Sequence, residues 1–179
     1  MERDRDSTVF QRLTQLQDVP GVYTTYIWRN VTVTFWFGPI DMEGCAELER
    51  GCRKIAAEHP EGVTAVNVMI PGGGSMPSAA ARAELARIMR EYNQSAAAIP
   101  IILAGDGFWA SAVRGMIASL AMLRPRRLQL QIFGTAAAAV EWLLPLHAAA
   151  TGVQLDAAEL RLVLQEAERA AASTRAAAA

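Results

Sequence analysis

The order of apolar and polar residues between residues 22 and 37 predicts two β-strands. β-branched and aromatic residues fill residues 22–28 and 31–37, and only Arg29 and Asn30 separate the two runs. A two-residue connection between such runs is typical of a β-hairpin, and Asn30 tolerates the positive φ that these turns need. The sequence therefore predicts an antiparallel hairpin at residues 22–37.

The same alternation assigns side chains to the two faces of this hairpin. Counting in steps of two gives one face with Tyr26, Trp28 and Trp36, and another with Val31, Val33, Phe35 and Phe37. Because both faces carry large apolar side chains, we expect both to be covered. Helices and the terminal segments would cover them as a core, and the alternative is a surface for self-association or for a protein partner.

After the hairpin, helical and strand patterns take turns along the chain. The helical patterns have apolar residues at three- and four-residue spacing, and the strand patterns are short apolar runs bounded by glycine or proline. Helices are expected from Asp41 to 58 and at 78–92, 108–123 and 136–149, and strands at 63–70, 99–104 and 128–133. Strands joined through helices run parallel, with right-handed crossovers. The sequence therefore predicts an α/β fold, with a mostly parallel sheet, a leading antiparallel hairpin and helices.

We place the α/β domain at residues 22–150 and expect a separate segment on either side of it. Residues 1–21 carry apolar residues at helical spacing and end at a Pro-Gly pair, which predicts a short docking helix. Residues 151–179 contain an Asp-x-x-Glu capping pair that starts at Asp156, followed by a last helix. Beyond Ala170 the alanine-rich tail has little apolar bulk and is expected to fray.

Composition and charge narrow the function classes. The chain has 179 residues, of which 52% are hydrophobic and 20% charged, so one folded domain with a sizeable core is expected. Lys and Arg number 17 against 18 Asp and Glu, and the basic cluster at residues 124–127 stands alone. This balance argues against nucleic acid as a partner. Residues 1–6 lack the apolar core of a secretory signal, and no apolar run is long enough to span a membrane, so a cytoplasmic protein is expected.

The residue types that most often carry catalysis are isolated from one another. Cys45 and Cys52 lie seven residues apart in a predicted helix, which is too far for a disulfide and suits a reducing compartment. His59 and His147 have no nucleophile or acid near them in the sequence. We therefore expect neither catalysis nor a bound cofactor or metal.

Several segments together carry a resemblance to a known family. They are the hairpin at residues 23–37, the helix from Asp41, the strand Thr64-Ala65-Val66-Asn67-Val68-Met69-Ile70 with its loop into the next helix, and residues 101–105 and 131–134. In this order they resemble the STAS domains, which include bacterial anti-sigma-factor antagonists and the tails of sulfate transporters. The resemblance is closer to bacterial STAS/SEC14-like proteins and covers about residues 22–148. It implies an α/β domain that binds a protein or a small ligand without chemistry of its own.

The resemblance also implies a modification site. In the antagonist members, the turn between the central strand and the next helix holds a phosphorylated Ser or Thr that follows an Asp. This turn corresponds to Ser75 and Ser78 here, but Gly74 and Pro77 stand in the places of the Asp. The family's role in binding therefore carries over more completely than its phosphorylation switch.

A glycine loop is the strongest candidate site. Gly72, Gly73, Gly74 and Ser75 lie between a buried strand and the helix that starts at Ser78. Glycines permit close approach to the backbone, and a helix N-terminus offers free N–H groups to an anion or to a phosphate on Ser75 or Ser78. An ordinary loop between a strand and a helix would have the same composition, and no phosphate-binding lysine follows.

A second loop follows the next strand and is expected at the same edge of the sheet. It contains Gly105, Asp106 and Trp109, and Arg114 in the next helix could add a positive charge. Together with the glycine loop, these residues would form a small pocket. The alternative is a simple turn in which Asp106 caps the helix and Trp109 packs locally.

These observations support two functions from different classes. The first is a non-enzymatic STAS-like module that binds a protein partner through the glycine loop and the following helix, with homodimerisation through the hairpin or terminal helices. The second is a carrier or sensor that holds a small apolar or anionic ligand above the two loops.

Overall fold

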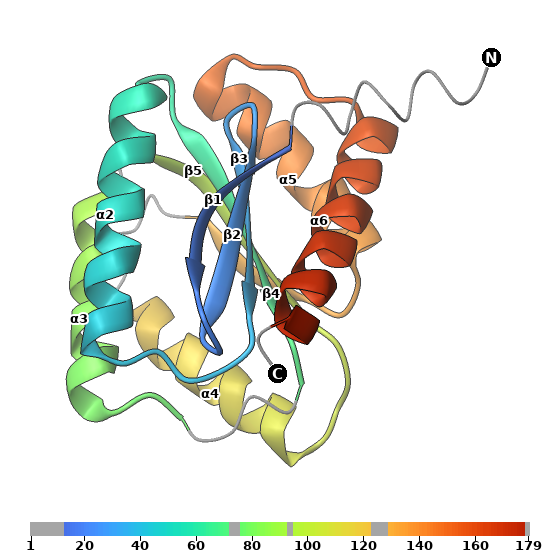
Figure 1. Ribbon diagram of the computed structural model, residues 1–179. Helices are drawn as coiled ribbons and strands as arrows, with labels where there is room; N and C mark the ends of the chain where they lie inside the picture. The colour runs from blue at the N-terminus through green and yellow to red at the C-terminus, as the bar shows by residue number, and fades with distance from the viewer. Residues whose placement is uncertain (1–12, 72–75, 93–94, 123–128, 178–179) are drawn as a thin grey trace.

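The structure is a computed structural model that describes residues 13–71, 76–92, 95–122 and 129–177. A six-stranded sheet lies between two helical layers (Figure 1), and its strands are adjacent in chain order. They are β1 (Thr14–Val19), β2 (Tyr23–Trp28), β3 (Val31–Trp36), β4 (Val63–Met69), β5 (Ala96–Leu103) and β6 (Leu130–Phe133). β1, β2 and β3 pair antiparallel, and β3 to β6 pair parallel. The predicted α/β fold with a leading hairpin is confirmed.

The helices divide between the two faces of the sheet. α2 (Met42–Glu58), α3 (Ala79–Tyr92) and α4 (Phe108–Met122) cover one face, and α5 (Ala136–Thr151) and α6 (Ala157–Ala177) cover the other. Of the five helices in the described residues, four begin at a residue whose side-chain oxygen accepts a hydrogen bond from a backbone N–H of the first turn: Asp41, Ser78, Thr135 and Asp156. These bonds satisfy N–H groups that a helix cannot pair internally, which explains where the helices start.

The segment before residue 22 differs from the prediction. Residues 14–19 form strand β1 and pair with β2 from Thr14 opposite Ile27 to Val19 opposite Tyr23. The pairing satisfies backbone groups along the edge of β2, and a local helix would leave them unpaired. The prediction of a helix is therefore wrong for these six residues, and residues 1–12 lie outside the described part of the chain.

The faces of the hairpin also differ from the prediction. Trp28 lies opposite Val31, and Trp36 lies opposite Tyr23. Directly opposed residues share a face, so Tyr26 and Trp28 face α5 and α6 together with Val31, Val33 and Phe35, whereas Trp36 faces α2 and α3. Counting in steps of two fails across a tight turn, because the turn sets the register of the second strand.

In the turn of the hairpin, the residue with a positive φ lies one position earlier than predicted. Arg29 has the positive φ, at 51°. Asn30 instead uses its side chain, whose Nδ2 donates to the Gly62 carbonyl at 3.0 Å. This bond links the hairpin turn to the start of β4.

The end of the chain is more ordered than the sequence predicts. α6 continues to Ala177, and Ala171 is only 2% exposed in the core with Tyr26 and Leu164. Thr174 lies 3.5 Å from the Tyr26 hydroxyl. The expected fraying beyond Ala170 is wrong for the described residues, because the small alanine side chains let the helix approach the hairpin closely.

Candidate functional site

An apolar cavity of about 270 Å³ lies between the sheet and the layer formed by α2, α3 and α4. The strands supply its floor, and the helices supply walls that include Leu48, Leu85, Met89, Val113 and Ile117. For comparison, an engineered cavity of about 150 Å³ holds benzene. This cavity is large enough for a small organic molecule.

The floor of the cavity carries a row of polar side chains, one from each of the first four strands. Gln17, Thr25, Thr34 and Asn67 lie opposite one another in register, and all line the cavity. We call these four residues the polar row. On β5 the row gives way to Ile101, which lies opposite Asn67.

Most of the polar row is held by hydrogen bonds within the protein. The hydroxyl oxygens of Thr25 and Thr34 are 3.0 Å apart, and Gln17 Nε2 donates to the Glu47 carbonyl at 2.5 Å. Trp36 Nε1 donates to Asn67 Oδ1 at 2.8 Å. These bonds fix the side chains in place and give the floor of the cavity a defined shape.

Thr32 is the polar side chain of the floor that the protein leaves unpaired. It lies two residues before Thr34 on the same face of β3, and it is 5% exposed. Across the described residues, no hydrogen bond involves its hydroxyl. Its neighbour on β4 is Ala65, whose small side chain leaves room beside it.

The described residues that line the cavity include no Asp, Glu, Lys, Arg or His. Burying a charged group without an opposite charge is strongly unfavourable. The cavity therefore suits a neutral molecule better than an anion or a cation.

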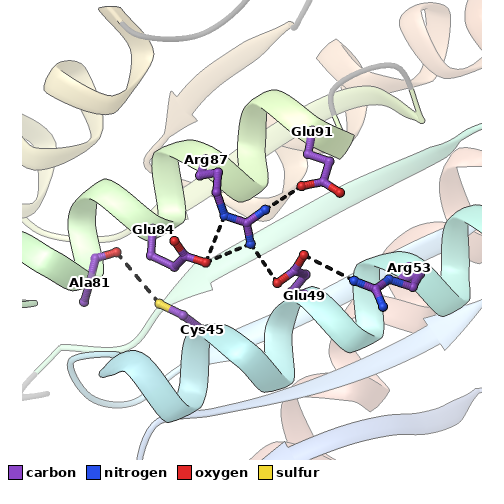
Figure 2. Close-up of polar contacts among 7 residues, drawn as sticks. All are labelled: Cys45, Glu49, Arg53, Ala81, Glu84, Arg87 and Glu91. Atoms are coloured by element: carbon purple, nitrogen blue, oxygen red, sulfur yellow. Dashed lines mark hydrogen bonds and ion pairs between the residues drawn. The ribbon is translucent and has the colours of Figure 1, made fainter.

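Two of the three helices that form the walls are joined by a network of ion pairs (Figure 2). Arg87 of α3 contacts Glu49 of α2 at 2.7 Å, Glu84 at 2.7 Å and Glu91 at 2.5 Å. Glu49 also accepts from Arg53 at 3.4 Å. The pairs with Glu84 and Glu91 lie within α3, and the pair with Glu49 bridges α3 to α2.

The glycine loop can be followed only at its end. Gly72, Gly73, Gly74 and Ser75 lie outside the described residues, so their proposed contacts stay predictions. Ser78 caps α3, because its Oγ accepts from the Ala81 N–H at 3.1 Å. The residues just before it, Met76 and Pro77, line the cavity. Met76 is 37% exposed and is the one described lining residue that is exposed, so the cavity reaches the surface beside it.

The second loop contributes one of its four predicted residues to the cavity. Trp109 lines it, whereas Arg114 turns back to its own loop. There Arg114 Nη2 donates to the Gly105 carbonyl at 2.8 Å and lies 3.5 Å from Asp106 Oδ1. Gly105 has a φ of +86°, which glycine adopts without strain. Gly105, Asp106 and Arg114 therefore form a closed loop beside the cavity, and the pocket expected between this loop and the glycine loop stays a prediction.

Burial holds the thiols of Cys45 and Cys52 in the protonated form. Burial raises the pKa of the Cys45 thiol to about 11, and burial also raises the pKa of the Cys52 thiol to about 11. Both thiols are protonated at neutral pH, and the thiolate is the nucleophilic form. Their role here is packing around Tyr23, between α2 and the sheet.

Sequence reasoning missed the cavity floor. Its signal was present as polar residues at alternating positions of otherwise apolar strands, namely Thr25, Thr32, Thr34 and Asn67. Alternation of this kind places them on one face, but it does not say whether that face is solvent, core or cavity.

Comparison with known proteins does not assign the chain to a group. No protein-family model matches the sequence, and no curated protein matches it significantly. Within the described residues, no helix has the length and apolar character needed to cross a membrane. The evidence on function is therefore the geometry of the cavity.

Proposed function

We propose that this protein is a carrier or sensor that binds one small, neutral, largely apolar molecule between the sheet and α2, α3 and α4. The observation that carries this proposal is the cavity of about 270 Å³ with uncharged walls and an ordered polar floor. A ligand that fills it removes the apolar wall surface from water, and this burial favours binding.

Naphthalene is a suitable first probe, because it is neutral, apolar and larger than benzene. We expect it to bind the full chain in calorimetry and to raise the melting temperature, since a ligand that binds only the folded state stabilises it. Ala65→Phe should abolish binding, because position 65 lies on the floor and a strand side chain cannot turn away.

The matched control is Ala138→Phe on the exposed side of α5, which should bind naphthalene like the wild type. Should Ala65→Phe fail to fold, Ala56→Phe on the α2 wall provides a second test. Wild-type protein that gives no binding heat and no melting shift would refute the proposed function.

Partner binding in the manner of a cytoplasmic STAS-like regulatory module is the second candidate. It is favoured by Phe108, which is 92% exposed at the start of α4, one residue before Trp109 of the cavity wall. Aromatic side chains are enriched at protein–protein interfaces, and Phe108 is the most exposed large apolar side chain of the described residues. If a second copy of the chain is the partner, Phe108→Ser should shift the protein from dimer to monomer in sedimentation, and an unchanged mass would count against it.

A further inference from the structure

The floor of the cavity has hydrogen-bonding capacity that the protein does not use. Thr32 is 5% exposed and its hydroxyl is unpaired within the described part of the chain. In the neighbouring pair, one of Thr25 and Thr34 donates to the other across 3.0 Å, which leaves one hydroxyl hydrogen without an acceptor. These hydroxyl groups line the cavity, so a molecule that enters it can form hydrogen bonds with them.

We propose that the ligand is a neutral alcohol or phenol, whose hydroxyl bonds to Thr32 beside the Thr25 and Thr34 pair and whose apolar body lies under α3 and α4. This inference rests on the proposed function and adds the chemical class of the ligand. A hydroxyl group both donates and accepts, so it matches a floor that presents donors and acceptors together.

The other side of the cavity suits the apolar body of such a molecule. Leu85 and Met89 come from α3, and Val113, Met116 and Ile117 come from α4. Methionine side chains are flexible and polarisable, so they adapt to bodies of different shape. One side of the ligand is therefore fixed by hydrogen bonds and the other by packing.

The described lining of the cavity disfavours two other classes of ligand, charged molecules and pure hydrocarbons. A carboxylate or an ammonium group would enter the cavity without an opposite charge to meet it. A purely hydrocarbon ligand would fit the walls but would leave the Thr32 hydroxyl unpaired.

The test is a titration of the full chain with matched ligands that share one ring system. These are naphthalene, naphthol, its methyl ether, which can only accept a hydrogen bond, and naphthoate. We expect naphthol to bind roughly two- to tenfold more tightly than naphthalene, as one added hydrogen bond allows. The ether should fall between the two, and naphthoate should bind more weakly than any of them.

Thr32→Val should remove the preference for naphthol and leave naphthalene binding unchanged, because valine keeps the shape and loses the hydroxyl. Thr32→Ser, which keeps the hydroxyl, should retain the preference and also serves if the valine variant fails to fold. The matched control is Thr174→Val on α6, on the other side of the sheet from the cavity, which should change neither affinity.

The two proposals fail in different ways. If naphthalene binds and Ala65→Phe blocks it, but naphthol has no advantage or Thr32→Val leaves that advantage intact, the alcohol class is wrong and the cavity remains a binding site. Tighter binding of naphthoate than of naphthol would also overturn the alcohol class. If the wild-type protein binds none of the probes, both proposals are overturned.

Discussion

His147 on α5 is fully buried on the side of the sheet away from the cavity. Its Nδ1 lies 2.8 Å from the Thr64 hydroxyl, and its Nε2 has no partner among the described residues. Burial lowers the pKa of His147 below its ordinary value, and the nearby Glu61 raises it to a lesser extent. The imidazole is therefore neutral in the folded protein at neutral pH.

This burial predicts a loss of stability in mild acid. Below the unfolded-state pKa of about 6.5, the unfolded chain binds a proton at His147 that the folded chain resists, so the free energy of unfolding falls as the pH decreases. His147→Gln should flatten this dependence in urea unfolding between about pH 7 and about pH 5. His59→Gln is the control, and an unchanged slope in the His147 variant would contradict the prediction.

Gly51 of α2 lies against Gln17 of the cavity floor. A Cβ at this position would overlap the side-chain amide of Gln17, which donates to the Glu47 carbonyl. Gly51→Ala should therefore displace that amide and lose a hydrogen bond, at about 1 kcal/mol, while alanine gains about 1 kcal/mol over glycine within a helix. We expect little net change.

In a Gln17→Ala background the overlap is absent, so the same Gly51→Ala change should stabilise the protein by about 1 kcal/mol. Urea unfolding of the four proteins in this cycle measures the difference. An equal effect in both backgrounds would show that Gln17 does not restrict position 51.

Among the elements, α2 and α3 act as one wall because Arg87 bridges them through Glu49. Arg87→Met should loosen this wall and speed amide hydrogen exchange in α2 and α3, with no change in α5 and α6. Raised salt should act in the same direction on the wild type, since it screens exposed ion pairs. Arg50→Met is the control, because Arg50 pairs with Glu47 inside α2. Faster exchange throughout the protein would refute a local role.

The sequence predicted the elements whose pattern of apolar residues lies within the element itself. β-Branched runs predict the strands β2 and β3, and apolar spacing with caps such as Asp41 predicts the helices from α2 to α6. β1 was missed because its strand form comes from pairing with β2 rather than from its own pattern. The faces of the hairpin were misassigned because register is a property of two strands together.

The candidate site was harder to predict than the fold. Trp109 was identified from its place after β5, and it does line the cavity. Thr32 and Asn67 were not singled out, because a cavity depends on how far a helical layer stands from the sheet. No periodic pattern encodes that distance. The cavity could only be recognised once both layers were placed.

The whole molecule is packed differently on its two sides. α5 and α6 pack closely on the sheet around Trp28 and Leu143, whereas the layer of α2, α3 and α4 leaves the cavity. Internal voids contribute to the volume decrease on unfolding, so pressure destabilises a protein that contains them. The protein should therefore unfold readily under pressure in the absence of ligand.

Ala65→Phe should reduce the volume change of unfolding, because the new ring occupies part of the cavity, and bound naphthalene should act in the same direction. Tryptophan fluorescence under increasing pressure measures this volume. Ala138→Phe on the exposed side of α5 should leave it unchanged. If the wild type, Ala65→Phe and Ala138→Phe all show the same volume change of unfolding, the cavity collapses in the folded protein without a ligand.

The chain order of the sheet has a consequence for biosynthesis. Each strand pairs with the one made before it, so the sheet can grow as the polypeptide leaves the ribosome. The last helix, α6, nevertheless packs on β2 and β3 at the other end of the chain, and Thr174 reaches Tyr26. The apolar face of β2 and β3 therefore stays uncovered until α6 has been synthesised. During that interval the nascent chain exposes an apolar surface that a chaperone would recognise.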